Sequence, residues 1–369
     1  MNALAFAGLG WMQNDYSLVQ RGLRLYTKAL QQTNRVLQDP HSSAAQSDAV
    51  LASCRILSLF EMYRRLPSAT TARAQTVDWQ SHIDGSCRLI QLRGLAKHST
   101  EHGIKLYDAI RLTAIIHGIA KRRPNAFINL SWDIYKYRRK TLRDELFEIM
   151  STIPDLYQRF DAVGARTKSE LNLLELRRNV APAVELLQDL LVVAGRLQIW
   201  EARAIQLCQR KQSSSPVKVE KGKPGETLMD FCTLFGDGFF ATCANYWASC
   251  LKVFPTARLL RQQILALPGS PMNLPALPSW MDAEQPAHNL ADITPHFFRP
   301  GAGFATAQSA VFPLGAVLFY LARTGRRESP VFMRMMNIFT NSKTGGVMRD
   351  FVQSIVDFAV EYASGRGIP

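Results

Sequence analysis

The chain has 369 residues, of which 47% are hydrophobic and 20% are charged, and this composition excludes a protein that is mainly disordered. Lys and Arg outnumber Asp and Glu by 44 to 30, so the formal net charge is +14 at pH 7, and charge alone supports non-specific attraction to nucleic acid at most. No apolar run approaches the roughly 18 residues that a membrane span needs, and no basic signal segment opens the chain. We therefore expect no membrane partner and a location in the nucleus or the cytoplasm.

Apolar residues at helical spacing predict a succession of α-helices in the first part of the chain. An amphipathic helix is predicted around residues 23–37. Residues 50–63 are apolar almost all round, so their helix is expected to be central. A further helix is predicted over 78–94, with Asp78 as its N-cap and Gly94 as its C-cap.

The same periodicity continues to the end of the chain. The next helix must stop before Pro124, because the residue that precedes a proline avoids helical angles. Later helices are predicted at 142–149, 187–208, 304–323, 331–340 and 347–362. No alternating strand pattern occurs, so the sequence predicts an all-α, irregular multi-helix domain of long antiparallel helices, which spans residues 1–369 as a single domain.

Two stretches interrupt the helical pattern. Residues 210–226 are rich in Ser, Lys, Pro and Gly and have no apolar period, so burial cannot offset their ordering entropy and a flexible loop is predicted. Residues 268–300 hold seven of the 18 prolines, which predicts an irregular proline-rich loop without a regular helix.

Residues that often carry chemistry are present without a recognisable arrangement. The six cysteines include no CxxC pair, so they are predicted to be buried thiols in a reducing compartment. His98 and His102 could share a helical face as metal ligands, but no third ligand lies nearby and solvated histidines are the alternative. No HExxH, GxSxG or Walker A sequence occurs. We therefore expect no metal and no cofactor, the catalytic residues are unknown, and the sequence leaves open whether the protein is an enzyme.

Basic residues cluster at 121–123, 136–143 and 326–327. Such clusters can contact phosphates, because each cation displaces condensed counterions. They can equally be solvated helix ends, where long cations suit the helix dipole. The sequence does not decide between the two interpretations.

An aromatic cluster in the second half predicts a mostly apolar pocket for a small apolar metabolite. Its candidate lining residues are Phe235, Phe239, Phe240, Tyr246, Trp247 and Phe304. Glycines beside these residues would allow a ligand to approach closely, and the stretch 268–300 is long enough to cover them as a lid. The alternative is that these aromatic side chains fill the core.

Several segments, in this order, resemble the large C-terminal regulatory domain of fungal zinc binuclear-cluster transcription factors. The matching segments are 21–40, 51–63, 79–94, 111–132, 239–260, 311–323 and 345–359. The most specific residues of the resemblance, which we interpret as a structural family motif, are Trp79, His82, Gly85, Arg93, Gly94 and Arg111. The motif helix further predicts that Trp79 is buried and that Arg93 has a structural partner.

The resemblance implies an all-α domain that controls activity, dimerisation or effector sensing in its relatives. Those relatives bind zinc through six closely spaced cysteines, whereas no two cysteines here lie within four residues of each other. The first hypothesis is therefore a transcription-regulator-like protein that lacks the DNA-binding zinc cluster and controls or assists a secondary-metabolite gene cluster. The alternatives are a small-molecule-binding protein or cyclase-like enzyme on the same scaffold, and a scaffold whose partner is another protein or a second copy of itself.

Overall fold

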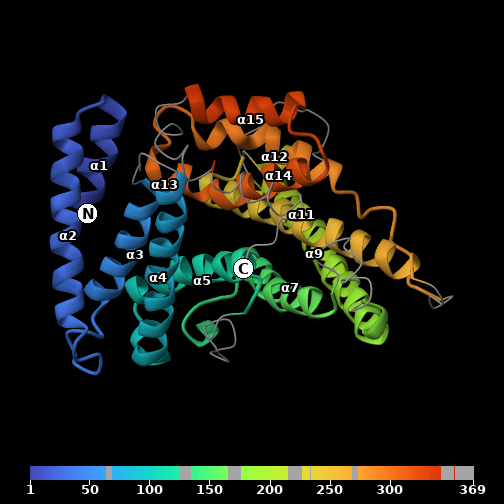
Figure 1. The fold of residues 1–369 in the computed structure, drawn as a ribbon, viewed down its shortest axis with the longest axis horizontal. Helices are drawn as coiled ribbons and strands as arrows, with labels where there is room; N and C mark the ends of the chain where they lie inside the picture. Colours follow the sequence, from blue (N-terminus) through green and yellow to red (C-terminus); the bar gives the residue numbers. More distant parts are fainter. Residues whose placement is uncertain are drawn as a thin grey trace. The chain divides into compact units, whose positions relative to one another are not determined.

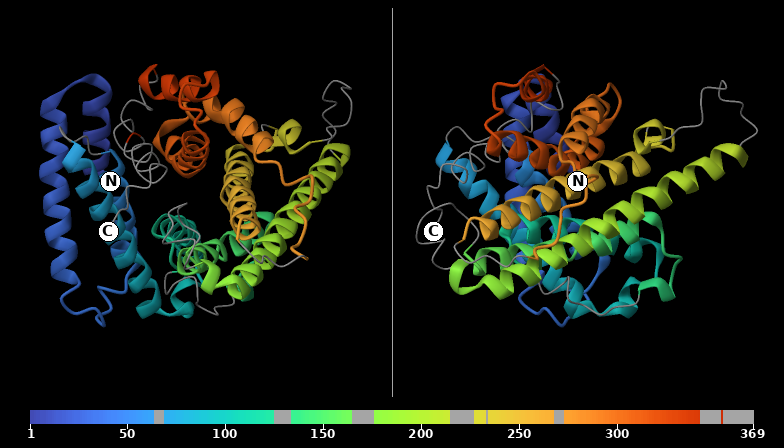
Figure 2. Two further views of the ribbon diagram at one scale, coloured as in Figure 1. Left: turned by 45° about the vertical axis from the view of Figure 1, so that its right-hand side comes forward. Right: turned by 90° about the vertical axis from the view of Figure 1, so that its right-hand side faces the viewer.

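The structure, a computed structural model, describes residues 1–63, 69–124, 134–164, 176–214, 227–232, 234–267, 273–341 and 353. Within these ranges every regular element is a helix and none is a strand, so the predicted all-α class is confirmed (Figure 1, Figure 2). The helix predicted at 347–362 lies outside the described residues, apart from residue 353.

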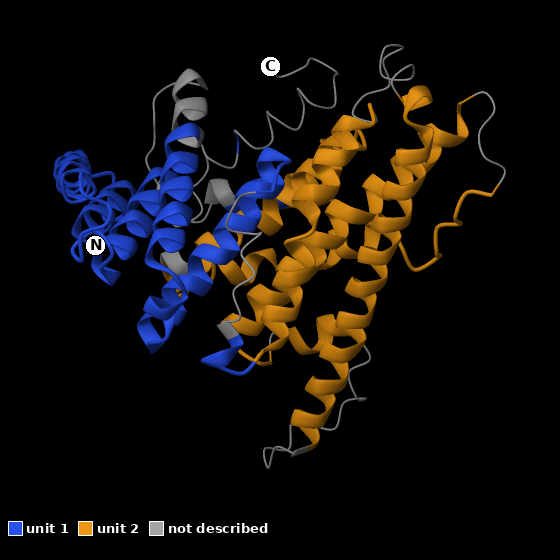
Figure 3. Ribbon diagram, turned by 90° about the horizontal axis from the view of Figure 1, so that it is seen from below, with its two compact units in different colours: residues 1–139, 335–358 blue, residues 140–334, 359–369 orange. Residues whose placement is uncertain are grey.

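The chain divides into two compact units, whereas the sequence predicted a single domain (Figure 3). Unit 1 comprises residues 1–139 and 335–358, and unit 2 comprises residues 140–334 and 359–369. Helical periodicity could not reveal this division, because it reports which face of a helix is buried and not which helices cover that face.

Unit 1 is built around the apolar helix that was predicted to be central. Its helices are α1 (Asn2–Gln13), α2 (Tyr16–Val36), α3 (Asp48–Tyr63), α4 (Ala69–Arg93), η1 (Leu95–His98), α5 (Glu101–Lys121) and η2 (Ile134–Lys136). Helix α3 contacts α1, α2, α4 and α5, so the central position of this segment is confirmed. The start of α5 is capped by Thr100, whose side chain accepts a hydrogen bond from the backbone N–H of Gly103 at 3.0 Å.

Helix α4 carries the buried tryptophan of the motif. Trp79 is 7% exposed, which confirms the predicted burial, and its ring meets the ring of His117 on α5 edge to face at 5.8 Å. The helix starts at Ala69, so the prediction that Asp78 is its N-cap was wrong. The residues between Ala69 and Asp78 lack an apolar stripe, which is why the sequence did not predict a helix there. Ala, Arg and Gln in this segment favour the helical conformation, and lengthening an existing helix is easier than starting a new one.

His117 is expected to make the stability of the protein depend on pH. Its side chain is buried, and burial lowers its pKa to about 4, against an opposing effect of Asp84, whose Oδ1 lies 3.3 Å from Nδ1. Since the folded pKa lies below the unfolded one, the stabilisation is fully present above pH ~6.5 and is lost as the pH falls towards 4.

The free energy of unfolding should therefore fall between these values, with a slope that approaches about 1.4 kcal/mol per pH unit from this group. Urea unfolding at a series of pH values measures the slope. His117→Gln should flatten it, whereas the exposed control His41→Gln should not. Equal slopes in the wild type and His117→Gln would contradict the prediction.

Unit 2 surrounds one long apolar helix. Its helices are α6 (Leu142–Met150), α7 (Ile153–Ala162), α9 (Val180–Ser214), α10 (Leu228–Cys232), α11 (Asp237–Leu265), α12 (Glu284–Phe297), α13 (Gly303–Ser309) and α14 (Val311–Arg323). A further helix, α15 (Pro330–Asn341), has residues in both units. Helix α11 contacts α6, α7, α9, α10, α12 and α14, and most of its residues from Phe240 to Phe254 are buried.

Both predicted interruptions differ from the structure. Helix α9 continues to Ser214, so the predicted loop 210–226 does not begin at residue 210, and residues 215–226 lie outside the described ones. The stretch 268–300 contains α12, so the prediction that its prolines forbid a regular helix was wrong. Pro286 lies in the first turn of α12, where backbone N–H groups have no partner within the helix, and Pro295 lies inside its last turn.

Candidate functional site

A groove in unit 2 lies where three helix ends meet. The start of α6, the end of α9 and the start of α11 enclose about 520 Å³, a volume within the range of small-molecule sites. One wall is apolar and is made by Leu142, Leu207, Phe235 and Phe239. Three cations also line the groove, namely Lys140, Arg143 and Lys211.

Antiparallel packing of α9 and α11 brings these ends together (Figure 2). Trp200 on α9 stacks on Tyr246 of α11 with ring centroids 5.1 Å apart. Further along α9, Cys208 lies in the groove with Thr242, which comes earlier on α11. The predicted antiparallel arrangement of long helices is therefore confirmed for this pair.

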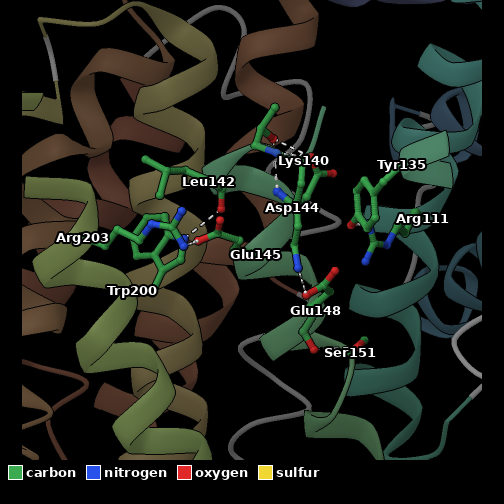
Figure 4. A network of polar contacts seen from close by, with 11 residues as sticks. Arg111, Tyr135, Lys140, Leu142, Asp144, Glu145, Glu148, Ser151, Trp200 and Arg203 are labelled. Atoms are coloured by element: carbon green, nitrogen blue, oxygen red, sulfur yellow. Dashed lines mark hydrogen bonds and ion pairs between the residues drawn. The ribbon is translucent and has the colours of Figure 1, made fainter. Parts of the chain in front are cut away.

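Side chains of α9 hold the start of α6 in place (Figure 4). The indole Nε1 of Trp200 donates a hydrogen bond to the carbonyl oxygen of Leu142 at 2.8 Å, and Arg203 forms an ion pair with Glu145 at 3.0 Å. The first turn of α6 is closed by a capping box in which Thr141 and Asp144 satisfy each other's backbone N–H groups. The α6 end of the groove is thus held by side-chain and backbone contacts.

The acidic side chains of α6 all have partners, and none of them lines the groove. Asp144 belongs to the capping box, Glu145 pairs with Arg203, and Glu148 accepts a hydrogen bond from Lys140 at 2.6 Å (Figure 4). No aspartate or glutamate is among the residues that line the groove. The lining therefore carries positive charge beside an apolar wall.

The neutral polar groups of the lining are satisfied or inert. The hydroxyl of Thr141 donates to Asp144 at 2.6 Å, and that of Thr242 donates to the carbonyl of Gly238 at 2.8 Å. Burial raises the pKa of the Cys208 thiol, although nearby Lys211 opposes this effect. The thiol therefore stays protonated at neutral pH and adds no negative charge.

The structure separates the six residues that were predicted to line a pocket. Phe235 and Phe239 line the groove, with ring centroids 5.7 Å apart and nearly perpendicular planes. Phe240 packs on Phe297 at 4.7 Å and is buried, as are Tyr246 and Trp247. The side chain of Phe304 lies outside the described residues.

Sequence reasoning missed the cations of this groove and the cysteine beside them. Lys140 and Arg143 belong to a basic cluster for which the sequence allowed either phosphate contact or a solvated helix end, and Lys211 belongs to the segment predicted to be a loop. Nothing in the sequence joins these residues to the aromatic pair, because their proximity depends on how α9 and α11 pack.

Most residues of the motif hold helices of unit 1 together. Arg93 donates to the carbonyl oxygen of Ser47 at 2.8 Å and forms an ion pair with Asp48, so its predicted structural partner is confirmed. Arg111 donates to the hydroxyl of Tyr135 at 3.3 Å (Figure 4).

A buried polar contact joins three helices through another motif residue. The hydroxyl of Tyr26 on α2 donates to Glu61 on α3 and lies 3.1 Å from Nε2 of His82 on α4. Tyr26 also stacks on Phe60 at 4.3 Å. His82 therefore helps to join α4 to the rest of unit 1.

The two motif glycines are expected to respond to alanine in opposite directions. Gly94 has a φ of +71° after the last residue of α4, where a Cβ is strained, so Gly94→Ala should lower the free energy of unfolding by about 1 kcal/mol. Gly85 is exposed within α4 and nothing lies within 4 Å of the position that a Cβ would occupy, so Gly85→Ala should raise it by roughly 0.5–1 kcal/mol. Urea unfolding of both variants tests this, and a destabilising Gly85→Ala would contradict the open surroundings of that position.

Each basic cluster has at least one cation in an ion pair. The pairs are Lys121 with Asp84 at 3.0 Å, Arg138 with Asp108 at 2.8 Å, Lys140 with Glu148 at 2.6 Å and Arg326 with Glu284 at 2.6 Å. These contacts favour the interpretation of the clusters as helix ends and polar faces.

The candidate metal ligands do not converge. His98 is fully buried in η1 and its Nδ1 lies 3.3 Å from the carbonyl oxygen of Gly103, whereas His102 is exposed on α5. Among the residues that the structure describes, no group of three His, Cys, Asp or Glu side chains is placed to hold a metal ion.

All six cysteines are buried and form no disulfide with one another, as predicted. None of the described helices combines the length and the apolar character that crossing a membrane requires.

Comparison with known proteins gives a match to the first third of the chain. Residues 3–117 match the family model described as a fungal specific transcription factor domain, and this segment lies entirely within unit 1. No curated protein and no solved structure matches the chain. The resemblance of the later segments remains a prediction. The resemblance predicted from the sequence is confirmed over residues 3–117, which are similar to a fungal specific transcription factor domain.

Proposed function

We propose that this protein regulates transcription in the nucleus of a fungus without itself reading a DNA sequence, and that it serves a secondary-metabolite gene cluster. The observation that carries the proposal is the match of residues 3–117 to a fungal specific transcription factor domain. The contacts of Trp79, His82 and Arg93 support it, because these motif residues stabilise the helices of unit 1.

The charge distribution supports an indirect role. Although the chain carries a net charge of +14, cations of all three basic clusters are paired with carboxylates. Sequence-specific recognition needs side chains placed against base edges, whereas scattered cations provide salt-sensitive attraction to any duplex. The protein would then reach its promoters through a partner that reads DNA.

The groove of unit 2 supports control by a small molecule. Its volume of about 520 Å³ suits an effector of moderate size, and the contacts of Trp200 and Arg203 hold the helix start that forms one side of it. In this proposal, unit 1 supplies the regulatory domain and unit 2 supplies the effector site.

A tethering experiment tests the regulatory function. The full chain is fused to a heterologous sequence-specific DNA-binding module and expressed in a fungal host with a reporter gene that carries the module's site. We expect the fusion to change reporter transcription severalfold relative to the module alone. The Trp79→Ala fusion should lose the effect, and the surface control Leu92→Ala, on the same helix, should keep it.

Reporter transcription equal to that of the module alone, although the fusion is folded and nuclear, would refute the proposed function. Deletion of the gene should also change transcripts of the neighbouring biosynthetic genes. Unchanged transcripts would refute the link to secondary metabolism. They would not bear on the regulatory activity, which the reporter assay tests.

A further inference from the structure

We infer that the unit 2 groove binds an amphipathic small anion, with an aromatic or polycyclic apolar body and one acidic group such as a carboxylate. This inference rests on the proposed function, because it names the chemical class of the effector. It depends on two properties that occur together in the groove, namely a positively charged lining and an apolar aromatic wall.

No acidic residue of the lining offsets the positive charge of the groove. Lys140 is compensated by Glu148, but within the part of the chain that the structure describes Lys211 has no acidic partner. The ammonium group of Lys211 instead lies 5.9 Å from the centre of the Phe235 ring. The guanidinium group of Arg143 adds a further positive charge to the lining. An acidic group in the groove would therefore gain favourable electrostatic interactions, with no carboxylate of the lining to repel it.

The apolar wall suits the body of such a ligand. Phe235 and Phe239 are only half-buried, their ring planes are nearly perpendicular, and both line the groove together with Leu142 and Leu207. Stacking of a ring against these side chains removes apolar surface of both partners from water. The ammonium group of Lys211 lies over the Phe235 ring, beside this wall. One ligand molecule can therefore place its acidic group near Lys211 and its ring against the wall at the same time.

The neutral groups of the lining favour a ligand that needs few directional contacts. The hydroxyls of Thr141 and Thr242 already donate hydrogen bonds within the protein, and the Cys208 thiol is buried. Recognition would then depend on charge and apolar contact, and less on a network of hydrogen bonds. A sugar or another polyhydroxylated molecule would lose its hydration without adequate replacement.

Two fluorescent probes of matched shape test the inference on the full chain. 1-Anilinonaphthalene-8-sulfonate carries one negative charge, and N-phenyl-1-naphthylamine has the same aromatic body without it. We expect the anion to bind about tenfold more tightly than the neutral probe at moderate salt, since one close ion pair near a surface is enough for such a ratio. Equal affinities for the two probes would overturn the proposal of an anionic ligand.

Variants assign the binding to the groove. Lys211→Gln, alone and combined with Arg143→Gln, should weaken binding of the anion severalfold and leave the neutral probe unchanged. Phe239→Ala should weaken both probes. The matched controls Lys105→Gln and Tyr16→Ala change exposed side chains of unit 1 and should alter neither affinity. Thermal unfolding of each variant checks that it folds, and Lys211 is exposed, so the single variant is expected to unfold like the wild type.

The remaining outcomes also decide. Anion binding that is unaffected by the Lys211 and Arg143 substitutions would place the probe elsewhere and overturn the inference. Displacement of the probe by a short single-stranded oligonucleotide at low concentration would assign the groove to nucleic acid instead. If neither probe binds, the inference that the groove is an effector site is refuted. The regulatory function is tested separately by the tethered reporter.

Discussion

Replacement of Trp79 by alanine is expected to lower the free energy of unfolding by about 3–5 kcal/mol, because it removes a large buried side chain and leaves a cavity in unit 1. Trp79 is 7% exposed and lies against the ring of His117, which is itself buried. The cavity would open between α4 and α5, which contact each other directly. Urea unfolding followed by circular dichroism measures the loss.

Two variants of the same helix control this measurement. Trp79→Phe keeps an aromatic ring against His117 and should retain more of the stability than alanine does. Leu92→Ala changes a side chain that is 38% exposed and should cost much less. If Trp79→Ala unfolded at the same urea concentration as Leu92→Ala, the burial of the tryptophan would have no energetic consequence and the packing described for α4 would be wrong.

Replacement of Trp200 by alanine is expected to have an effect of similar size in unit 2, again about 3–5 kcal/mol. Trp200 is 2% exposed, stacks on Tyr246 at 5.1 Å and donates a hydrogen bond to the carbonyl oxygen of Leu142 at 2.8 Å. The substitution therefore removes packing between α9 and α11 and also the hydrogen bond that holds the start of α6. Because α6 lines the groove, the variant should also bind the anionic probe more weakly than the wild type.

Trp200→Phe separates the two contributions, since it can keep the stacking and loses the indole N–H. Its cost should be smaller, about 0.5–1.5 kcal/mol for the hydrogen bond with a further loss from the smaller ring. Ile199→Ala is the matched control, because the neighbouring residue on α9 is 70% exposed. Similar unfolding of Trp200→Ala and Ile199→Ala would contradict the central position of Trp200.

Local patterns in the sequence were sufficient for the helices and for several of their ends. A helix places residues three and four apart on one face, so apolar spacing alone predicted α2, α3, α5 and α9. The burial of Trp79 followed from the same rule. Arg93 lies beside the apolar stripe of α4, and a cation in such a place needs a partner, although the sequence could not name Ser47 and Asp48.

Proline content misled the prediction for residues 284–297. A proline interrupts a helix in its interior, but at the first turn the missing N–H removes no hydrogen bond. Pro286 occupies that favourable position, so α12 forms in spite of it. Composition alone could not distinguish the two cases, since the position of a proline relative to the helix start decides its effect.

The sequence by itself determined the all-α class, the apolar faces of the helices and the resemblance of residues 3–117 to a transcription factor domain, because each depends on residues close together along the chain. The groove was decided by tertiary structure alone. Lys211, at the end of α9, meets Phe235 and Phe239 near the start of α11 because the two helices run antiparallel, and Trp200 holds α6 beside them. Aromatic residues that share one helix face by spacing were likewise divided, since Phe239 faces the groove while Tyr246 and Trp247 are covered by neighbouring helices. Which face a helix buries is a local property, whereas the neighbour that covers it depends on the packing of the whole unit.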